Sequence, residues 1–372
     1  MLTAKNISSS TAVEYFLKGP QQKGESRWHG RGAEKLKLVG TIDDERAFSH
    51  VANGRSPDGT EQLNAKTLDP SKRRAALDCT FSAPKSVSLI GLVSDRRLIE
   101  SHQKSVSKVL NLIEQVFTQT RVREFGKQKR VATDNLIVAT FNHIESREQD
   151  PHLHSHCLIM NATQAPNGKW QSLCNDEIFA NKKSIGMAYQ NFLSMEVEGL
   201  GYKIEHKQHS QFEIQGFTDR DLKEFSKRRQ QILQITGAES SLWQREKAWS
   251  ITRQRKKEVS PEELIQRWQQ QAQLLRINFA QSLVLVPQPA NREDIELEET
   301  ISQEVDQLDD EQLCALVEYV ADYFEQEPDE QAQTQKMKIL RKVLKDGKTC
   351  TLERLTLATE ARQQAAHNKF RL

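Results

Sequence analysis

The sequence predicts an α+β fold, in which a core of strands and helices is followed by a region that is helical throughout. Strand-like apolar segments at 135–143 and 153–163 stand between segments with helical spacing at 97–119 and 184–200. From about residue 218, polar segments rich in Gln, Lys and Arg replace the strands. Because mixed elements give way to helices alone, we expect an α+β core with a helical extension.

The N-terminal elements are short and are separated by loops. Ser8 to Thr11 precede the segment AVEYFLK, a pattern typical of an N-cap and the first turns of a helix. Residues 76–93, ALDCTFSAPKSVSLIGLV, are β-rich and are interrupted by Pro84. We expect a strand, a turn and then a second extended or helical segment there. In 97–119, apolar residues at helical spacing predict a long amphipathic helix.

Two strands joined by a charged loop are expected next. The segments NLIVATFNH (135–143) and LHSHCLIMNAT (153–163) have the composition of strands. PNGKW (166–170) predicts a tight turn into another strand, and FEIQGF (212–217) predicts a further strand. The chain therefore supplies several strands, of which the first two here are close enough in sequence to pair.

The main domain boundary is predicted near residue 287. Helices are expected over 218–285, one of them opening at SPEELIQRW, where Ser is followed by Pro as at many helix starts. LVPQPANRED (285–294) then brings two prolines and the beginning of an acidic run. We expect one domain over 1–287 and a helical extension over 288–372.

Charge is distributed unevenly along the chain. The net charge of +2 is the sum of −15 over 291–330, +7 over 331–372 and +10 over 1–290. A basic main domain favours a polyanionic partner such as nucleic acid. Carboxylates repel phosphates, so the acidic segment is not expected to bind DNA. Its apolar residues recur at helical spacing, so it can pack on the core or bind a protein, with a solvated acidic helix as the alternative.

The composition excludes several classes of protein. The five cysteines form no CxxC pair and no metal-ligand spacing. The chain has no signal-peptide pattern and no apolar run near the length of a membrane span. We therefore expect a reduced, soluble, cytoplasmic protein without a membrane segment.

Three histidines occur at every second position in DPHLHSHCLIM, residues 150–160. Because side chains alternate along a strand, His152, His154 and His156 point the same way. His-x-His is a spacing by which one strand offers two imidazoles to one metal ion. His143 ends the preceding strand and supplies a third if the two strands pair antiparallel. Three imidazoles leave coordination positions open, which is typical of catalytic rather than structural sites.

The alternative is a strand that carries surface histidines and binds no metal. The third histidine on the neighbouring strand makes this alternative less favourable, because a metal site needs ligands from more than one element. The spacing alone does not decide which two of positions 152, 154 and 156 would be ligands.

Four segments resemble one known family. HIESREQDPHLHSH (143–156) resembles the three-histidine motif of MobF-type conjugative relaxases, the TraI/TrwC-like group of HUH endonucleases. TAVEYF resembles the family's N-terminal helix with its catalytic tyrosines, RWHGRGAEKLKLVG (27–40) the stretch after it, and LDCTFSAPKSVSL (77–89) the segment with an essential Asp. The motifs follow the family's order, and the likeness covers roughly 1–285.

The resemblance assigns the metal ligands. Carried over position by position, it implies that His143, His154 and His156 bind the metal. His152 falls on a variable position and becomes a bystander or a DNA contact. Asp78 matches the family's acidic residue, which would accept a proton or orient a metal-binding histidine through its other ring nitrogen.

The resemblance also assigns the nucleophile. Of the five tyrosines only Tyr15 matches the family's nucleophile, whereas Tyr189 and Tyr202 are expected to pack in the core. The sequence departs from many members, which have two or four tyrosines here, because Phe16 follows Tyr15 and no tyrosine occurs from there to residue 40. A second cleavage would therefore reuse Tyr15 or take a tyrosine from a second molecule.

Four further residues are candidates for DNA contacts. Lys85 and Arg147 could bind phosphates, with a plain solvated charge as the alternative for each. Trp28 and Arg31, next to His29, could stack on or contact an unpaired base, and Trp28 could instead belong to the core.

The implied function is site- and strand-specific nicking at a plasmid origin of transfer, through a 5′-phosphotyrosyl intermediate that is later religated. The implied fold is an antiparallel-sheet palm flanked by helices, with helical fingers over single-stranded DNA. Mg²⁺ or Mn²⁺ is the expected ion, although three imidazoles also suit Zn²⁺ or Ni²⁺.

The expected partners are single-stranded origin DNA, accessory transfer proteins and a type IV secretion coupling protein, and the expected location is the bacterial cytoplasm with export alongside DNA. A rolling-circle replication initiator is one alternative, disfavoured because the tyrosine precedes the histidines. A non-catalytic origin-binding protein is the other.

Overall fold

The computed structural model describes residues 2–16, 26–64, 69, 71–124, 126–207, 210–237, 240, 259–277 and 279. The extension predicted for 288–372 and the boundary near 287 lie outside these residues. Within them, no helix is both long and apolar enough to cross a bilayer.

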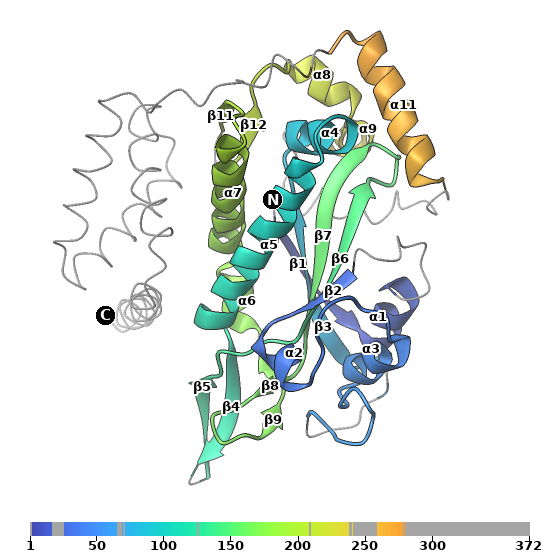
Figure 1. Ribbon diagram of the computed structural model, residues 1–372. Helices are drawn as coiled ribbons and strands as arrows, with labels where there is room; N and C mark the ends of the chain where they lie inside the picture. The colour runs from blue at the N-terminus through green and yellow to red at the C-terminus, as the bar shows by residue number, and fades with distance from the viewer. Residues whose placement is uncertain are drawn as a thin grey trace, which may run out of the picture.

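A five-stranded antiparallel sheet forms the centre of the molecule (Figure 1). Its order is β1 (Leu2–Ser8), β3 (Arg74–Ser82), β7 (Pro151–Met160), β6 (Val138–Glu145) and β2 (Ser26–His29). The two strands expected around the charged loop are β6 and β7, and they pair antiparallel with His143 opposite His154. This confirms the predicted pairing, and it places the longest strand, β7, at the middle of the sheet.

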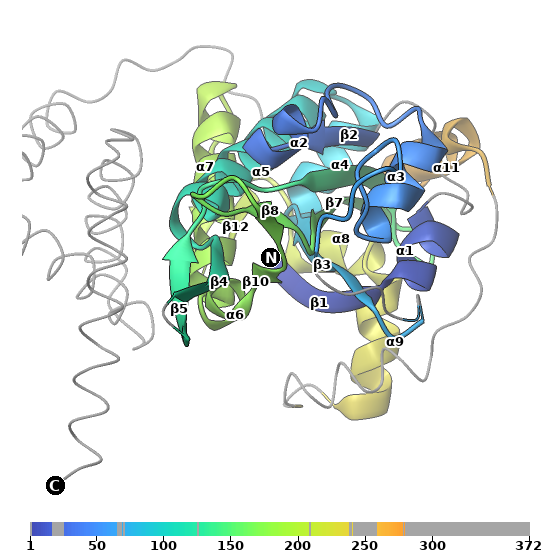
Figure 2. The same ribbon diagram turned by 90° about the horizontal axis from the view of Figure 1, so that it is seen from below.

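Two layers of helices cover the two faces of this sheet (Figures 1 and 2). On one face lie α4 (Lys85–Val93), α5 (Arg97–Val116) and α7 (Lys182–Gly199), whose apolar residues form a core with Leu153, Cys157 and Ile159 of β7. On the other face lie α1 (Ser9–Phe16) and α3 (Glu45–Ala52), packed on Leu158 and Met160. Alternate residues of β7 therefore face different cores.

Smaller elements surround the central sheet. The hairpin of β4 (Gln119–Glu124) and β5 (Lys127–Ala132) pairs with β10 (Leu173–Cys174). The expected turn at 166–170 joins β8 (Thr163–Gln164) to β9 (Trp170–Gln171), with Gly168 at a φ of 79°. β12 (Phe212–Ile214) is the strand predicted from FEIQGF and pairs with β11 (Ile204–His206). The remaining short helices are α2 (Arg31–Lys35) and α6 (Asp176–Ala180).

Beyond β12 the described chain is helical, as expected. α8 (Asp219–Glu224), α9 (Lys227–Thr236) and α11 (Pro261–Leu274) lie at one end of the sheet, near the turn that joins β6 to β7 (Figure 1). α11 begins as SPEELIQRW predicted, because the Ser260 hydroxyl accepts a hydrogen bond from the backbone N–H of Glu263 and Pro261 occupies the first turn. An apolar cluster, including Leu89, Phe225 and Trp268, joins α11 and the residue that follows α8 to α4.

Candidate active site

Three imidazoles meet at the edge where β6 and β7 carry the predicted histidines. The ligand atoms of His143, His154 and His156 all lie within 4.8 Å of one another. Their ring centroids are 5.1 to 5.3 Å apart. The cause is local, since residues two apart on β7 share a face and the antiparallel register puts His143 beside His154.

Two of these rings are oriented through Nδ1. The Nδ1 of His156 lies 3.0 Å from both carboxylate oxygens of Asp78, and that of His154 lies 2.8 Å from the carbonyl oxygen of His152. With Nδ1 donating to these oxygens, Nε2 of each ring carries the lone pair that a metal needs. Of the two roles considered for Asp78, this geometry supports orientation of a histidine.

The site suits a divalent metal. Burial, followed by the neighbouring imidazoles, lowers the pKa of His154 well below its usual value, so the ring is neutral. Neutral imidazole is the form that coordinates a metal, and three such ligands leave positions open for substrate oxygens. His152 stacks on His154 with ring centroids 4.5 Å apart, but it does not belong to the three-histidine group.

Tyr15 stands beside this group at the end of α1. The residue is 38% exposed, and its ring centroid lies 6.2 Å from that of His156. The next residue, Phe16, is buried between His156 and Phe141, with centroids 5.3 and 4.9 Å away. α1 thus uses one aromatic residue to anchor itself to the sheet and presents the other at the surface near the imidazoles.

The other tyrosines of the described chain are placed differently. Tyr189 and Tyr202 are buried in the large core, as expected from their helical context. The Tyr189 hydroxyl lies 2.7 Å from Nδ1 of His102, and the Tyr202 hydroxyl donates to Asp95. Tyr319 and Tyr323 lie outside the described residues. Among the tyrosines that the structure describes, Tyr15 is the one that the fold brings to the histidines.

The two predicted phosphate contacts differ in their surroundings. The Lys85 ammonium donates to the carbonyl oxygen of Pro151 over 2.7 Å, and burial lowers its pKa to about 8. It therefore has a partner inside the protein, at the first residue of β7. Arg147 lies in the turn between β6 and β7. A phosphate contact by either residue stays a prediction.

Trp28 and Arg31 lie at a cavity away from the histidines. Trp28 is only 7% exposed and packs with Phe48 in the smaller core, which supports the core alternative rather than base stacking. Arg31 is half exposed, and its Nε lies 3.6 Å from the buried carboxylate of Glu114. The cavity, about 450 Å³, also has Asn111 in its wall. A base contact by Arg31 stays a prediction.

Sequence reasoning missed a buried polar chain behind the histidines. Nε2 of His102 lies 2.8 Å from the Ser155 hydroxyl, which donates to the side-chain oxygen of Asn142 over 2.5 Å. Ser155 lies between two of the clustered histidines in sequence, and Asn142 precedes the third. An isolated His in α5 gave no pattern that could have revealed this role, because its partners are distant in sequence.

Comparison with known proteins finds a matching family model and two curated relatives. The family model described as TrwC relaxase matches residues 3–275. Two curated relatives, both named Multifunctional conjugation protein TraI, come from Escherichia coli and its strain K12. They are 38% identical over 267 residues (69% of this chain) and 34% identical over 312 residues (78% of this chain). The chain spans 15% and 17% of the lengths of these two relatives.

Solved structures are similar as well. Structures of the conjugative relaxase TrwC in complex with oriT DNA, one metal-free and one metal-bound, share 33% sequence identity with this chain. Each superposes with a TM-score of 0.69 over 75% of this chain and 100% of the TrwC chain.

Proposed function

The chain belongs to the TrwC relaxase family, and we propose that it cuts one strand of DNA at an origin of transfer and later rejoins it. The observation that carries the proposal is the position of Tyr15 beside three imidazoles, one of which is held by a carboxylate. The substrate follows from the similarity to TrwC, which was solved in complex with oriT DNA, and to the conjugation protein TraI.

In the proposed reaction, the phenol oxygen of Tyr15 attacks the scissile phosphorus. A phosphorus–oxygen bond to Tyr15 forms, the bond to the 3′ oxygen breaks, and the 3′ oxygen leaves as a hydroxyl after taking up a proton. The 5′ end stays joined to the protein as a phosphotyrosyl ester, which keeps the bond energy. Rejoining is the reverse, with a 3′-hydroxyl attacking the ester and the phenol leaving.

The proposed metal ligands are His143, His154 and His156, and Mg²⁺ or Mn²⁺ remains the expected ion. When bound, the ion would polarise the scissile phosphate and offset the charge that develops on its oxygens. Asp78 holds His156 in the orientation that this requires. Phe16 occupies the position after Tyr15, so a second cleavage is proposed to reuse Tyr15 or to take a tyrosine from another molecule.

A denaturing gel tests the proposal directly. The chain is incubated with labelled single-stranded DNA that contains a transfer origin, with Mg²⁺ or Mn²⁺. A labelled adduct that survives denaturation is expected. Binding without an adduct would support a non-catalytic origin-binding protein. A rolling-circle replication initiator would give an adduct with a replication origin instead, so both DNAs are compared.

The domain boundary is tested by truncation. We propose that 1–287 forms the nicking domain, with fingers over 218–285, and that 288–372 is an extension which contacts accessory transfer proteins or a type IV secretion coupling protein. Deleting 291–372 should leave cleavage in vitro largely intact and reduce transfer between cells. A truncated protein that folds but no longer nicks would place the extension within the nicking domain.

A further inference from the structure

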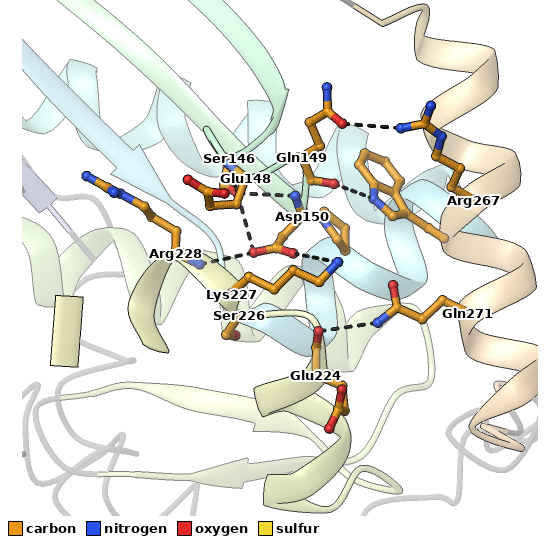
Figure 3. A network of polar contacts seen from close by, with 12 residues as sticks. Ser146, Glu148, Gln149, Asp150, Glu224, Ser226, Lys227, Arg228, Arg267 and Gln271 are labelled. Carbon is orange, nitrogen blue, oxygen red and sulfur yellow. Dashed lines mark hydrogen bonds and ion pairs between the residues drawn. The ribbon is translucent and has the colours of Figure 1, made fainter. Parts of the chain in front are cut away.

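The turn at 146–150 joins the two strands that carry the clustered histidines. It begins three residues after His143 and ends four residues before His154. Figure 3 shows polar contacts from α9 and α11 converging on this turn. Because the turn sets how the ends of β6 and β7 meet, whatever holds it also affects the distance between His143 and the other two imidazoles.

Asp150 supplies the contact to α9. Its side chain is 2% exposed; one carboxylate oxygen accepts the backbone N–H of Arg228 over 3.4 Å, and the other lies 3.9 Å from Nζ of Lys227. Ser226, at the N-cap position of α9, makes no side-chain cap bond, so the carboxylate from the turn takes its place. Burial raises the pKa of Asp150, and Lys85 and α9 oppose that rise.

α11 holds the neighbouring residue of the turn. The indole Nε1 of Trp268 donates to the carbonyl oxygen of Gln149 over 2.8 Å, and Arg267 donates to the side-chain oxygen of Gln149 over 3.2 Å. Gln149 has a φ of 59°, a left-handed conformation that a residue with a side chain rarely adopts. The packed indole therefore stabilises a backbone shape that the turn would not favour by itself.

Both helices are joined to α8: in α9, the Gln230 side chain donates to the carbonyl oxygen of Lys223. Gln271 of α11 donates to the carbonyl oxygen of Glu224 at the end of α8, over 3.3 Å. Trp268 and Phe225 share an apolar cluster with residues of α4. Lys85, the first residue of α4, donates to Pro151 and so holds the start of β7. The turn and the start of β7 are thus held by contacts from α9, α11 and α4.

We propose that Asp150 is a positioning residue that couples the docking of α9 and α11 to the geometry of the three-histidine metal site. The inference rests on the metal site of the proposed function. Coupling of this kind is reciprocal, so metal binding should stabilise the docked helices as much as docking favours metal binding. The position of the region proposed to form the fingers would then affect the geometry of the metal site, where cleavage is proposed to occur.

The test compares two alanine variants that each remove a helix cap. Asp150→Ala removes the cap of α9, and Thr218→Ala removes the cap of α8, where the Thr218 hydroxyl accepts the N–H of Asp221 over 3.2 Å. Both should lower the melting temperature of the full chain by roughly 2–4 °C. Titration with Ni²⁺, followed by calorimetry, should show about five- to tenfold weaker binding for Asp150→Ala and unchanged binding for Thr218→Ala.

Two further variants separate charge, capping and packing. Asp150→Asn keeps an acceptor for the N–H groups of α9 and should recover part of the lost Ni²⁺ affinity. Trp268→Phe keeps a ring in the cluster but removes the donor to Gln149, and it should weaken Ni²⁺ binding about threefold. This variant serves as the test if Asp150→Ala does not fold.

Hydrogen exchange measures the reciprocal effect. Ni²⁺ should slow exchange of the amides at 227–230 in the wild-type protein and not in Asp150→Ala, which lacks the acceptor for these amides. The proposal is overturned if Asp150→Ala folds and binds Ni²⁺ as the wild-type protein does, because Asp150 is then only a helix cap. If Asp150→Ala does not fold, unchanged Ni²⁺ binding by Trp268→Phe overturns it. A wild-type protein that binds no Ni²⁺ would overturn the metal site itself, and the coupling with it.

Discussion

The two faces of the β6–β7 pair use histidine in opposite ways. On the face toward α1, His154 and His156 each engage Nδ1 within the protein and keep Nε2 for a ligand. On the face toward α5, His102 has both ring nitrogens within hydrogen-bond distance of protein hydroxyls, those of Tyr189 and Ser155. The His102 ring therefore supports the fold and has no free nitrogen for a metal. A histidine is therefore identified as a candidate ligand by what its second nitrogen contacts, and burial alone does not identify it.

The buried chain has a defined direction. The Ser155 hydroxyl donates to Asn142, so it accepts from Nε2–H of His102, and Nδ1 of His102 accepts from the Tyr189 hydroxyl. This arrangement requires a neutral ring. Burial lowers the pKa of His102 to about 3, in agreement with that requirement. Ser155 and Asn142 alternate in sequence with the clustered histidines, so this chain fixes the two strands from the opposite face of the sheet.

The largest effect on cleavage is expected from Tyr15→Phe, on the face toward α1. The variant should form no covalent adduct and no nick, because the phenol oxygen is the proposed attacking atom. Binding of single-stranded DNA should stay within a few-fold of the wild-type value. Labelled origin DNA on native and denaturing gels measures both. An adduct with this variant would show that another residue is the nucleophile.

The next largest effect is expected from the histidine variants, which distinguish the proposed metal ligands from the neighbouring His152. Alanine variants of His143, His154 and His156 should each lose bound metal and cleavage, whereas His152→Ala should be much milder because His152 lies outside the group. Metal content by mass spectrometry is measured with cleavage rate. Equal damage from His152→Ala would contradict the assignment of ligands.

Asp78→Asn tests the carboxylate that orients His156. Metal affinity should fall about 10–100-fold, because an oriented imidazole loses its charged partner. The free energy of unfolding should change little, since the Asp78 side chain is not part of the apolar core. Calorimetric titration with Mn²⁺ and urea unfolding give the two quantities. Unchanged affinity would mean that Asp78 acts otherwise, for instance on the proton of Tyr15.

His102→Gln tests the face toward α5 and should act mainly on stability. At pH 7.5 the free energy of unfolding should fall by about 1–3 kcal/mol, because Ser155 or Tyr189 loses a buried partner. Metal affinity should change less than in Asp78→Asn. Urea unfolding with metal titration on the same sample checks this contrast.

The same variant gives a pH dependence. The pKa of His102 is 6.5 in the unfolded state and about 3 in the folded state. At a pH between these two values, His102 binds a proton in the unfolded state and not in the folded state. Stability from this group is therefore complete above pH 6.5 and falls by about 1.4 kcal/mol per unit as the pH drops below it. Glutamine does not titrate, so the difference between wild type and His102→Gln should narrow from pH 6.5 to 5. A constant difference would contradict the neutral buried ring.

Much of the site was predictable from local sequence. The period of two along β7 and a short loop back to β6 were enough to place three histidines together. The helical spacing in 97–119 and the Ser-Pro start of α11 were confirmed for the same reason: both signals act within a few residues. The resemblance then selected Tyr15, which the fold places beside His156.

The remaining roles depended on residues far apart in the chain. Asp78 meets His156 because β3 pairs with β7 in one register, and Lys85 meets Pro151 because α4 packs at the start of β7. The sequence left Trp28 open between a base contact and the core, and its burial against Phe48 supports the core. Residue spacing predicts neither burial nor hydrogen bonds between residues that are far apart in the chain.

The sequence by itself determined which side chains share a face, because a strand turns each second residue to the same side whatever surrounds it. Only the tertiary structure decided what each face meets. Asp150 is a turn residue in the sequence, and it became a helix cap when α9, more than 70 residues later, docked on it. His102 became a neutral structural ring when α5, α7 and β7 enclosed it, since water was excluded and its partners were fixed.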